Sequence, residues 1–383
     1  MKKKLFIIIP LALLALVSCG KNNKNSTSAK TENGSNGTVE EVFEAKPVDG
    51  IAPLFDEGLG YFNTNPSIID VSENERYVFY TVNEKYKQES YNIAVRKATK
   101  EGSEWKYGEK KIILRPSENG WDKNRVLACD VVKGNFTYQN ETYSYLMAYE
   151  GNNSKSEVHF SIGLAVSKTL DGDWIKVGTE PIIKYNPNEY GLNGWGCGQP
   201  SLVSYDKQGK VYLFYTLGEP MLSEQRVCEM DASNLDNIKK NSFHSILNTD
   251  GLLDYDSNVA FVDADFAIDE TTNELISVRN VNPVSSTPPM TYKAVQVAKM
   301  PLAGMYKLDS SWTIIEEKVN MLDLDDPEHD KDGWERVLSG CIISDPYSRA
   351  SVNNLSIGMT VTSWNEETNA YLFYQTITAY KVS

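Results

Sequence analysis

Residues 65–81 read NPSIIDVSENERYVFYT, and residues 199–216 read QPSLVSYDKQGKVYLFYT. Each stretch begins with an amide residue before Pro-Ser, continues as an apolar run, and ends after a polar turn in an aromatic run. Alternating apolar and polar residues between turn-forming residues are typical of β-strands. A third aromatic run, AYLFY, occupies residues 370–374. The chain therefore repeats one strand-turn-strand unit.

Strand-like runs recur along the chain in sets of four. The four complete sets comprise residues 66–71, 76–82, 91–98 and 111–115; 129–134, 143–149, 161–168 and 174–177; 200–205, 211–217, 226–231 and 243–247; and 259–268, 274–280, 294–300 and 312–318. A fifth set, at 356–363, 370–376 and 377–382, has only three members. The polar residues that we place at the heads of the first four sets are spaced by 65, 69 and 64 residues: Asn65, Asp130, Gln199 and Asp263.

A period of this length with four strands per unit predicts an all-β fold, a five-bladed β-propeller with four-stranded blades and insertions in its loops. Because the last set has three strands, we predict that a strand from before Asn65 closes the ring. A large β-sandwich or jelly roll is the competing fold, although its strands would not recur in equal blocks of four.

The N-terminus has the features of an export signal. Three lysines precede an apolar run at residues 5–17, which is too short to span a bilayer. The segment Leu16-Val17-Ser18-Cys19 resembles the lipobox of bacterial lipoproteins, in which the cysteine is acylated. We predict a signal peptide at residues 1–18, a flexible polar tether at 19–46 that begins at the lipidated Cys19, and the propeller at 47–383. The protein would then be held at a membrane of the bacterial cell envelope, periplasmic or surface-exposed, by its lipid alone. An ordinary signal peptide with a chance cysteine is the alternative.

The charge of the chain limits its partners. The net charge is −14, and loss of the three lysines of the signal peptide makes it about −17. An acidic surface argues against nucleic acid and against a polyanion held by bulk charge, whereas neutral substrates stay open. We expect a monomer without a cofactor. The acidic run at residues 323–332 lacks the spacing of a calcium loop, so we expect a solvated loop there rather than a structural Ca²⁺ site.

Four cysteines remain once Cys19 is assigned to the lipid: Cys129, Cys197, Cys228 and Cys341. They form an even set in an oxidising compartment, but they are widely spaced in a large domain. We expect buried free thiols rather than a disulfide framework.

Several motifs lie in or beside the predicted strands: NPSI at 65–68, LACDVV at 127–132 with YLMAY at 145–149, GLAVS at 163–167 before Trp174, and GQPSL at 198–202 with VYLFYT at 211–216. Through these motifs the sequence, from residue 49 to the end, resembles the five-bladed propeller glycosidases of glycoside hydrolase family 43. The resemblance implies an aspartate that heads the first inner strand and acts as the base, and a second aspartate that heads the inner strand of the third blade and adjusts the pKa of the acid. It also implies a glutamate in the fourth blade that donates the proton. In this chain Asn65 and Gln199 occupy the first two positions and cannot ionise. Asp263 and Asp265 stand in place of the glutamate.

Glycoside hydrolysis generally needs one protonated and one ionised carboxyl group beside the scissile bond. In a propeller the heads of the inner strands converge on one funnel, so polar residues there are candidates for this chemistry. We predict Asp130 as the ionised group and Asp265 or Asp263 as the acid, because neighbouring carboxylates raise each other's pKa. Glu219 and Glu150, at the ends of second strands, are further candidates. Each aspartate could instead cap a turn.

Sugar rings stack on flat aromatic side chains, and their hydroxyls take directional hydrogen bonds. The predicted substrate-binding residues are Asn65, Gln199, Trp195, Trp121, Trp334 and Arg279. Each tryptophan could equally be a core residue between blades. The sequence therefore predicts a glycoside hydrolase acting on a neutral oligo- or polysaccharide, or a carbohydrate-binding lipoprotein that has lost the chemistry.

Overall fold

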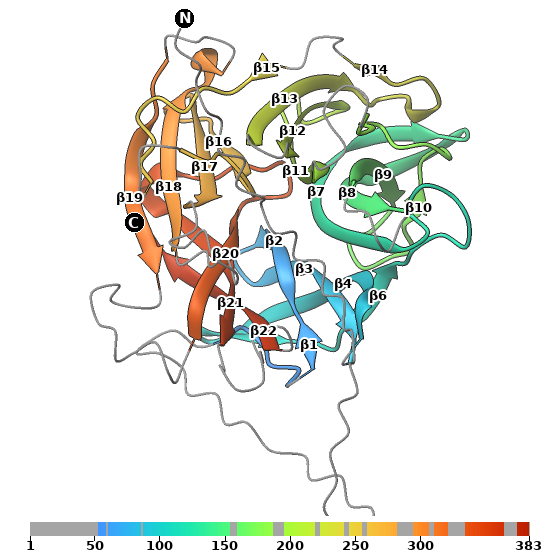
Figure 1. Ribbon diagram of the computed structural model, residues 1–383, viewed down its shortest axis with the longest axis horizontal. Coiled ribbons are helices and arrows are strands. Elements are labelled where there is room, and N and C mark those ends of the chain that lie inside the picture. The colour runs from blue at the N-terminus through green and yellow to red at the C-terminus, as the bar shows by residue number, and fades with distance from the viewer. Residues whose placement is uncertain are drawn as a thin grey trace, which may run out of the picture.

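The computed structural model describes residues 53–58, 60–85, 87–153, 159–186, 195–218, 223–240, 245–254, 259–281, 294–305, 310–320, 334–363 and 374–382. These residues form five β-sheets arranged around a central axis (Figure 1). The predicted all-β, five-bladed propeller is confirmed. Within the described ranges, no helix has the length and hydrophobicity needed to cross a membrane.

Each blade is a sheet whose strands follow one another outward from the axis. Blade 1 contains β2 (Thr64–Ser72), β3 (Glu75–Glu84) and β4 (Lys87–Glu101), with β5 (Glu104–Tyr107) and β6 (Lys111–Leu114) both paired to β4. Blade 2 contains β7 (Arg125–Tyr138), β8 (Glu141–Asn152), β9 (Ser161–Ser167) and β10 (Ile175–Lys176). Blade 3 contains β11 (Gly196–Ser204), β12 (Lys210–Gly218) and β13 (Ser223–Asp231), with β14 (Lys239–Lys240) and β15 (Ser245–Ile246) both paired to β13. Blade 4 contains β16 (Asp265–Asp269), β17 (Glu274–Asn280), β18 (Ala294–Pro301) and β19 (Thr313–Asn320).

Blade 5 joins the two ends of the described chain. Its order from the axis is β20 (Trp334–Ile342), β21 (Ser356–Ser363), β22 (Tyr374–Lys381) and β1 (Tyr61–Phe62). β1 runs parallel to β22, so the outermost strand comes from before Asn65, in agreement with the predicted ring closure.

The strands predicted for blade 5 were partly wrong. The inner strand β20 was missed, and residues 374–381 form one strand where two were predicted. Ser339 interrupts the alternation of β20 with a φ of 50°, and Gly340 follows it, so that the apolar residues of this strand do not form a regular run. The rest of the predicted strand at 370–376, up to residue 373, lies outside the described residues.

Apolar side chains fill the space between adjacent sheets. Phe214 of blade 3 stacks on Phe266 of blade 4 with ring centres 4.0 Å apart. Cys129, Cys197, Cys228 and Cys341 are buried, and no disulfide joins any of these described cysteines, as the sequence predicts. Each thiol therefore serves as a small apolar side chain of the core.

The segment at residues 53–58 is anchored to both blade 5 and blade 1. The amide of Leu54 donates to the carbonyl of Ile377 at 2.8 Å. The Glu57 side chain, 6% exposed, pairs with Arg96 at 2.7 Å and with Lys110, both of blade 1. Burial alone would raise the pKa of Glu57, but the hydrogen bonds from Lys110, Arg96 and Tyr80 lower it below its usual value.

The loop between β20 and β21 crosses the axis beyond the C-terminal ends of the inner strands. Its backbone and Ser348 make hydrogen bonds to the inner strands of the other four blades: Asp70 N to Ser344 O at 2.8 Å, Lys133 N to Pro346 O at 2.6 Å, Ser348 Oγ to Leu202 O at 2.7 Å and Ile268 N to Ser348 O at 3.0 Å. The strand heads therefore lie at the opposite end of the axis from this loop.

Candidate functional site

One non-glycine residue at the head of each inner strand adopts a left-handed backbone conformation. These residues, which we call the bulge ring, are Asn65 (φ 50°), Ala128 (42°), Gln199 (52°), Asp263 (49°) and Ser339 (50°). Such φ values are uncommon outside glycine and mark β-bulges that redirect a side chain. The register of the inner strand slips beside the bulge in blades 1, 2, 3 and 5. Each blade thus presents one bulge residue to the axis.

A second set of residues satisfies the backbone N–H of every bulge residue. These residues, which we call the capping ring, lie at equivalent positions of the second strands. The side chain of each accepts a hydrogen bond from the bulge-residue N–H of the following blade. The pairs are Ala128 N to Thr81 Oγ1 at 2.8 Å, Gln199 N to Glu150 Oε2 at 2.8 Å, Asp263 N to Thr216 Oγ1 at 3.2 Å, Ser339 N to Asn280 Oδ1 at 2.8 Å and Asn65 N to Thr360 Oγ1 at 3.1 Å. All five acceptor residues are buried. The ring therefore meets the requirement that buried amides be paired.

A third set, the lower ring, lies two residues beyond the bulge ring and consists of Ser67, Asp130, Ser201, Asp265 and Cys341. Its carboxylates hold neighbouring blades together. Asp130 accepts from Ser67 Oγ of blade 1 at 2.6 Å and from Leu202 N of blade 3 at 2.6 Å. Asp265 accepts from Ser201 Oγ at 2.7 Å and from Ile342 N of blade 5 at 2.7 Å.

Burial raises the pKa of both lower-ring aspartates, and the nearby charge of Asp130 further raises that of Asp265, to about 8. With the bulge ring they enclose a cavity of about 30 Å³. A space of this size holds about one water molecule, which is too little for a sugar.

A larger cavity of about 360 Å³ opens above the bulge ring. Among the described residues, two carboxyl groups line it, those of Glu150 and Asp263. Trp195, 45% exposed, lies at its edge in blade 3, and Tyr91 and Arg125 line it from blades 1 and 2. This cavity has the size and the mixed lining of a ligand site.

Glu150 is buried, and one of its two carboxyl oxygens has no hydrogen-bond partner among the described residues. Its Oε2 accepts from Gln199 N, whereas Oε1 makes no hydrogen bond to the described part of the chain. Burial raises the pKa of Glu150 to about 8, and the charge of Asp263 adds to this rise, whereas the hydrogen bond from Gln199 N and the positive charge of Arg125 act against it. A pKa of about 8 favours the protonated form of Glu150 at neutral pH. A Cβ atom on Gly198 would lie 2.3 Å from Glu150 Oε2, so glycine makes room for this side chain.

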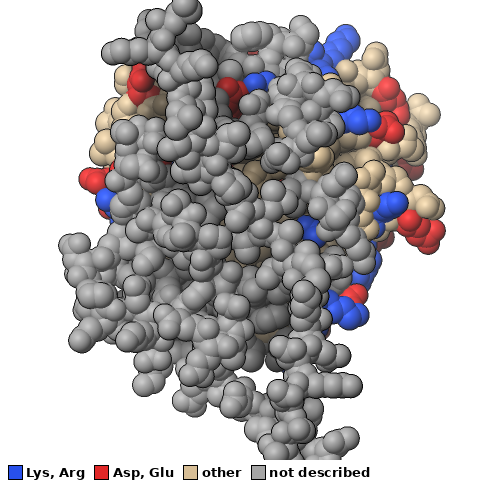
Figure 2. Space-filling view, in the orientation of Figure 1, with Lys and Arg blue, Asp and Glu red and all other residues tan. Residues whose placement is uncertain are grey.

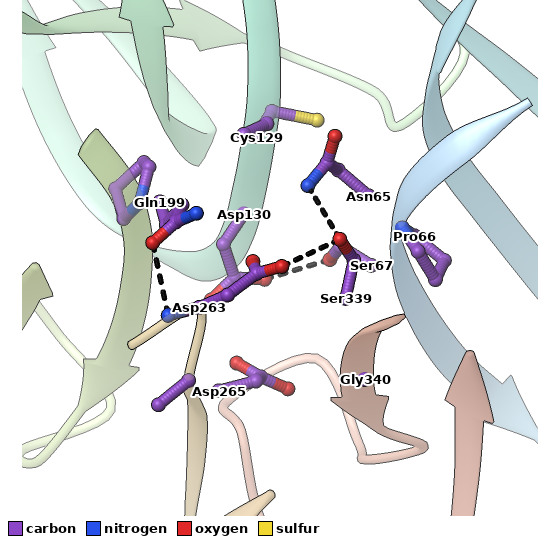
Figure 3. Close-up of a pocket in the computed structure, with 13 residues that line it drawn as sticks. Asn65, Pro66, Ser67, Cys129, Asp130, Gln199, Asp263, Asp265, Ser339 and Gly340 are labelled. Atoms are coloured by element: carbon purple, nitrogen blue, oxygen red, sulfur yellow. Dashed lines mark hydrogen bonds between the residues drawn. The ribbon is translucent and has the colours of Figure 1, made fainter. Parts of the chain in front are cut away.

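Asp263 lies at the end of a chain of hydrogen bonds within the bulge ring (Figure 3). The side-chain amide Nδ2 of Asn65 donates to Ser339 Oγ at 2.9 Å, and Ser339 Oγ donates to Asp263 Oδ2 at 2.6 Å. Asn280 Nδ2 donates to the same oxygen at 2.9 Å. Burial raises the pKa of Asp263, and the donors Ser339 and Asn280 act against this rise. Gln199 joins the two acids, because its Oε1 accepts from Asp263 N at 2.9 Å.

The structure brings five of the predicted site residues together in the larger cavity: Asn65, Glu150, Trp195, Gln199 and Asp263. Asp130 was placed at the head of the second inner strand, but Ala128 has that position and Asp130 lies two residues deeper. Asp130 and Asp265 therefore line only the smaller cavity. Their catalytic role stays a prediction.

Two other predicted residues are packed away from both cavities. Trp121 stacks on Tyr149 with ring centres 5.5 Å apart. Arg279, 1% exposed, pairs with Asp254 at 2.8 Å and donates to the carbonyl of Leu253. Trp334 opens β20, but its side chain lies outside the described part, as do Glu219 and the acidic run at 323–332. Sequence reasoning missed Arg125, Tyr91 and Ser339 as cavity residues and gave Glu150 only as a secondary candidate.

The sequence matches no protein-family profile and no curated protein. Solved structures do match. A thermostable family-43 glycoside hydrolase is 13% identical, with a TM-score of 0.51 over 88% of this chain and 92% of that chain. A GH43_1 enzyme from Xanthomonas citri complexed with xylotriose is 11% identical, with a TM-score of 0.54 over 87% and 89% of the two chains. An α-L-arabinofuranosidase from Podospora anserina in complex with cellotriose is 12% identical, with a TM-score of 0.51 over 87% and 96%.

The chain has the fold of these glycoside hydrolases. At such low identity the likeness establishes the five-bladed architecture, and the chemistry has to be argued from this chain's own residues. Asn65 and Gln199, where the family resemblance implies aspartates, both belong to the bulge ring. The departure from the family pattern is therefore located at the floor of the larger cavity.

Proposed function

We propose that the protein is a glycoside hydrolase in which Glu150 is the proton donor and Asp263 is the ionised carboxylate. The main observation behind this proposal is that Glu150 is the one ionisable residue of the capping ring. In the other four blades a short neutral residue, threonine or asparagine, caps the next bulge. A threonine would satisfy Gln199 N equally well, and burying a carboxyl group is unfavourable.

Gly198 supports the same interpretation. The residue before the bulge has a side chain in the other four blades: Thr64, Leu127, Val262 and Leu338. Only beside Glu150 is it glycine, because a Cβ atom at this position would lie 2.3 Å from Oε2. Two departures from the repeat thus serve to place one acid at the cavity.

We assign the two roles that hydrolysis requires to these two carboxyl groups, because burial raises the pKa of both but Asp263 has more hydrogen-bond donors to its ionised form. Glu150, protonated at neutral pH, can give its proton to the glycosidic oxygen as the bond to the anomeric carbon breaks. Asp263, whose ionised form is favoured by Ser339 and Asn280, can take a proton from the attacking water, whose hydroxyl goes to the anomeric carbon. Proton exchange with solvent then restores both groups. Trp195, which is 45% exposed at the edge of the cavity, can supply a ring on which a sugar stacks.

The second candidate is a carbohydrate-binding protein without hydrolytic activity. It is favoured by the composition of the bulge ring, in which Asn65 and Gln199 cannot ionise and Ala128 has no functional group. Such a protein would use the same cavity and the same aromatic platform.

A hydrolysis screen on plant and algal oligosaccharides, with binding measured on the same panel, separates the two candidates. We expect cleavage of at least one glycan by the wild type, and its loss in both Glu150→Gln and Asp263→Asn. Glu104→Gln, at an exposed site on β5, is the matched control and should keep full activity. Binding without cleavage would favour the second candidate, and full activity of Glu150→Gln would exclude Glu150 as the acid.

We also propose that the mature protein is anchored to a membrane through a lipid on Cys19, on the basis of the lipobox alone. An acylated protein should partition into the detergent phase, and Cys19→Ala should move it to the aqueous phase. An unchanged partition would contradict the proposal.

A further inference from the structure

We propose that the larger cavity recognises an anionic group on the sugar, a carboxylate or a sulfate ester, through the guanidinium of Arg125. The inference rests on the proposed function only in that the ligand is a carbohydrate bound in this cavity. It holds for a hydrolase and for a binding protein alike.

Arg125 opens β7 and lines the larger cavity with Glu150. Its side chain is partly buried, and its Nε is fully buried without a hydrogen-bond partner in the described structure. The guanidinium carbon lies 5.8 Å from the centre of the Tyr91 ring, which lines the same cavity. A buried N–H of a charged group is costly unless a partner satisfies it.

The other arginines whose side chains are described show how the charge of a guanidinium is balanced elsewhere in the molecule. Five of them pair with a carboxylate: Arg76 with Asp70 at 2.6 Å, Arg96 with Glu57 at 2.7 Å, Arg226 with Glu224 at 2.6 Å, Arg279 with Asp254 at 2.8 Å and Arg349 with Glu270 at 2.7 Å. Arg115 is exposed to solvent. Arg125 is partly buried, yet no carboxylate of the described residues lies within 4.0 Å of it.

The charge of Arg125 lowers the pKa of Glu150, but neither acid of the cavity pairs directly with Arg125 among the described contacts. Glu150 directs Oε2 to Gln199 N, and the carboxylate of Asp263 is held by Ser339 and Asn280. Neither forms an ion pair with Arg125 among the described contacts. The guanidinium therefore faces a cavity with room for a ligand and keeps its planar set of N–H donors, which matches the paired oxygens of a carboxylate or sulfate.

This inference revises the neutral substrate that the sequence predicts. The overall charge of −14 disfavours a dense polyanion held by bulk attraction, but it places no limit on a single acidic group recognised at short range. Figure 2 shows that acidic and basic side chains are interspersed where described residues are visible, so in that view no extended basic surface would attract a polyanion. We infer a glycan with an acidic group at the residue bound in the cavity.

The test compares matched pairs of oligosaccharides by calorimetric binding to the full-length protein. One pair is an oligogalacturonide and its methyl ester, and the other is a sulfated galactan oligosaccharide and its desulfated form. We expect the anionic member of one pair to bind at least about tenfold more tightly than its neutral partner, as for a charged hydrogen-bond pair. Whichever pair shows the difference identifies the anion as carboxylate or sulfate.

In the variants, Arg125→Met should bring the anionic member to the affinity of the neutral one, whereas Arg115→Met should leave it unchanged. Arg125→Lys keeps the charge without the planar fork and should retain part of the preference, which makes the test independent of the folding of the methionine variant. Equal affinity within both pairs, or no binding to any of the four probes, overturns the inference. Charge-dependent binding without cleavage supports the anionic ligand and overturns the proposed hydrolysis. Cleavage of a neutral glycan that Arg125→Met does not affect supports the proposed hydrolysis and overturns the anionic ligand.

Discussion

Replacing Glu150 by glutamine removes one exchangeable proton at nearly constant volume. The amide oxygen of the new side chain can still accept from Gln199 N, so the cap on the third bulge is preserved. Because Glu150 is proposed to protonate the leaving oxygen, we expect kcat to fall by about 10²-fold to 10⁴-fold, the usual range for losing an acid–base group. In the wild type, kcat/KM should fall as the pH rises through about 8, where Glu150 loses its proton.

The same variant tests whether Glu150 is buried as the structure shows. The pKa of Glu150 is about 8 in the folded state against an ordinary value of 4.5, so the folded protein holds this proton more tightly than the unfolded chain does. The free energy of unfolding should therefore be highest below pH 4.5 as far as this group is concerned, and should fall as the pH rises to about 8. At about 1.4 kcal/mol per pH unit, the fall is up to about 5 kcal/mol. Glu150→Gln should lack this component, because glutamine does not titrate.

Urea denaturation of both proteins at several values from pH 5 to pH 9 measures the difference directly. We expect Glu150→Gln to gain stability relative to the wild type as the pH rises, so that it is the more stable protein at pH 9. Asp130 and Asp265 are common to both proteins and cancel in the comparison, whereas Asp263, whose charge acts on Glu150, contributes part of the difference. Parallel stability curves would show that Glu150 has an ordinary pKa, and would remove the argument for it as the proton donor.

Three further predictions concern positions around the site. Gly198→Ala should displace Glu150 and lower turnover by about tenfold or more with little loss of secondary structure by circular dichroism, since the other blades carry side chains at this position; unchanged kinetics would contradict this. Asp130→Asn should turn an amide group toward the N–H of Leu202 or the hydroxyl of Ser67, and we expect it to lower the free energy of unfolding by about 1–3 kcal/mol in chemical denaturation. Wild-type stability with lost turnover would instead support the catalytic role that the sequence predicts. Glu57→Gln should lower stability by about 3–5 kcal/mol, because it leaves two partly buried cations without their partner, and an unchanged melting temperature would show that this cluster does not anchor the N-terminal segment.

The architecture was predictable because a propeller repeats its pattern. The aromatic second strands β3 and β12 and the Pro-Ser heads of β2 and β11 follow the same order along the chain, and strand alternation is a local property of the sequence. β20 was missed for a local reason as well. Its bulge at Ser339 lies in the middle of its short apolar stretch, and alternation breaks at that point.

The geometry of the site was not predictable to the same degree. Spacing alone placed Asp130 at the level of Asn65, but a bulge at Ala128 shifts the strand, so that the aspartate faces the smaller cavity. The sequence gives no signal for this bulge, because alanine has no special preference for a positive φ. Arg279 was expected at the site and is instead paired with Asp254, a contact between segments that the sequence does not show to be neighbours.

The internal repeat offers a physical criterion for function that does not depend on relatives. At an equivalent position in every blade the fold requires one acceptor for a buried N–H, and threonine or asparagine meets this requirement in four of the five. A residue that meets the same requirement at a higher energetic cost needs another reason to be there. Glu150 is such a residue, and the neighbouring glycine that accommodates it adds the entropic cost of a flexible backbone. The same comparison gives weaker evidence of a catalytic role for the aspartates of the lower ring. Asp130 and Asp265 use both carboxylate oxygens to join blades, and this structural role is enough to explain why they are buried. The repeat therefore favours Glu150 over Asp130 as the acid of the cavity.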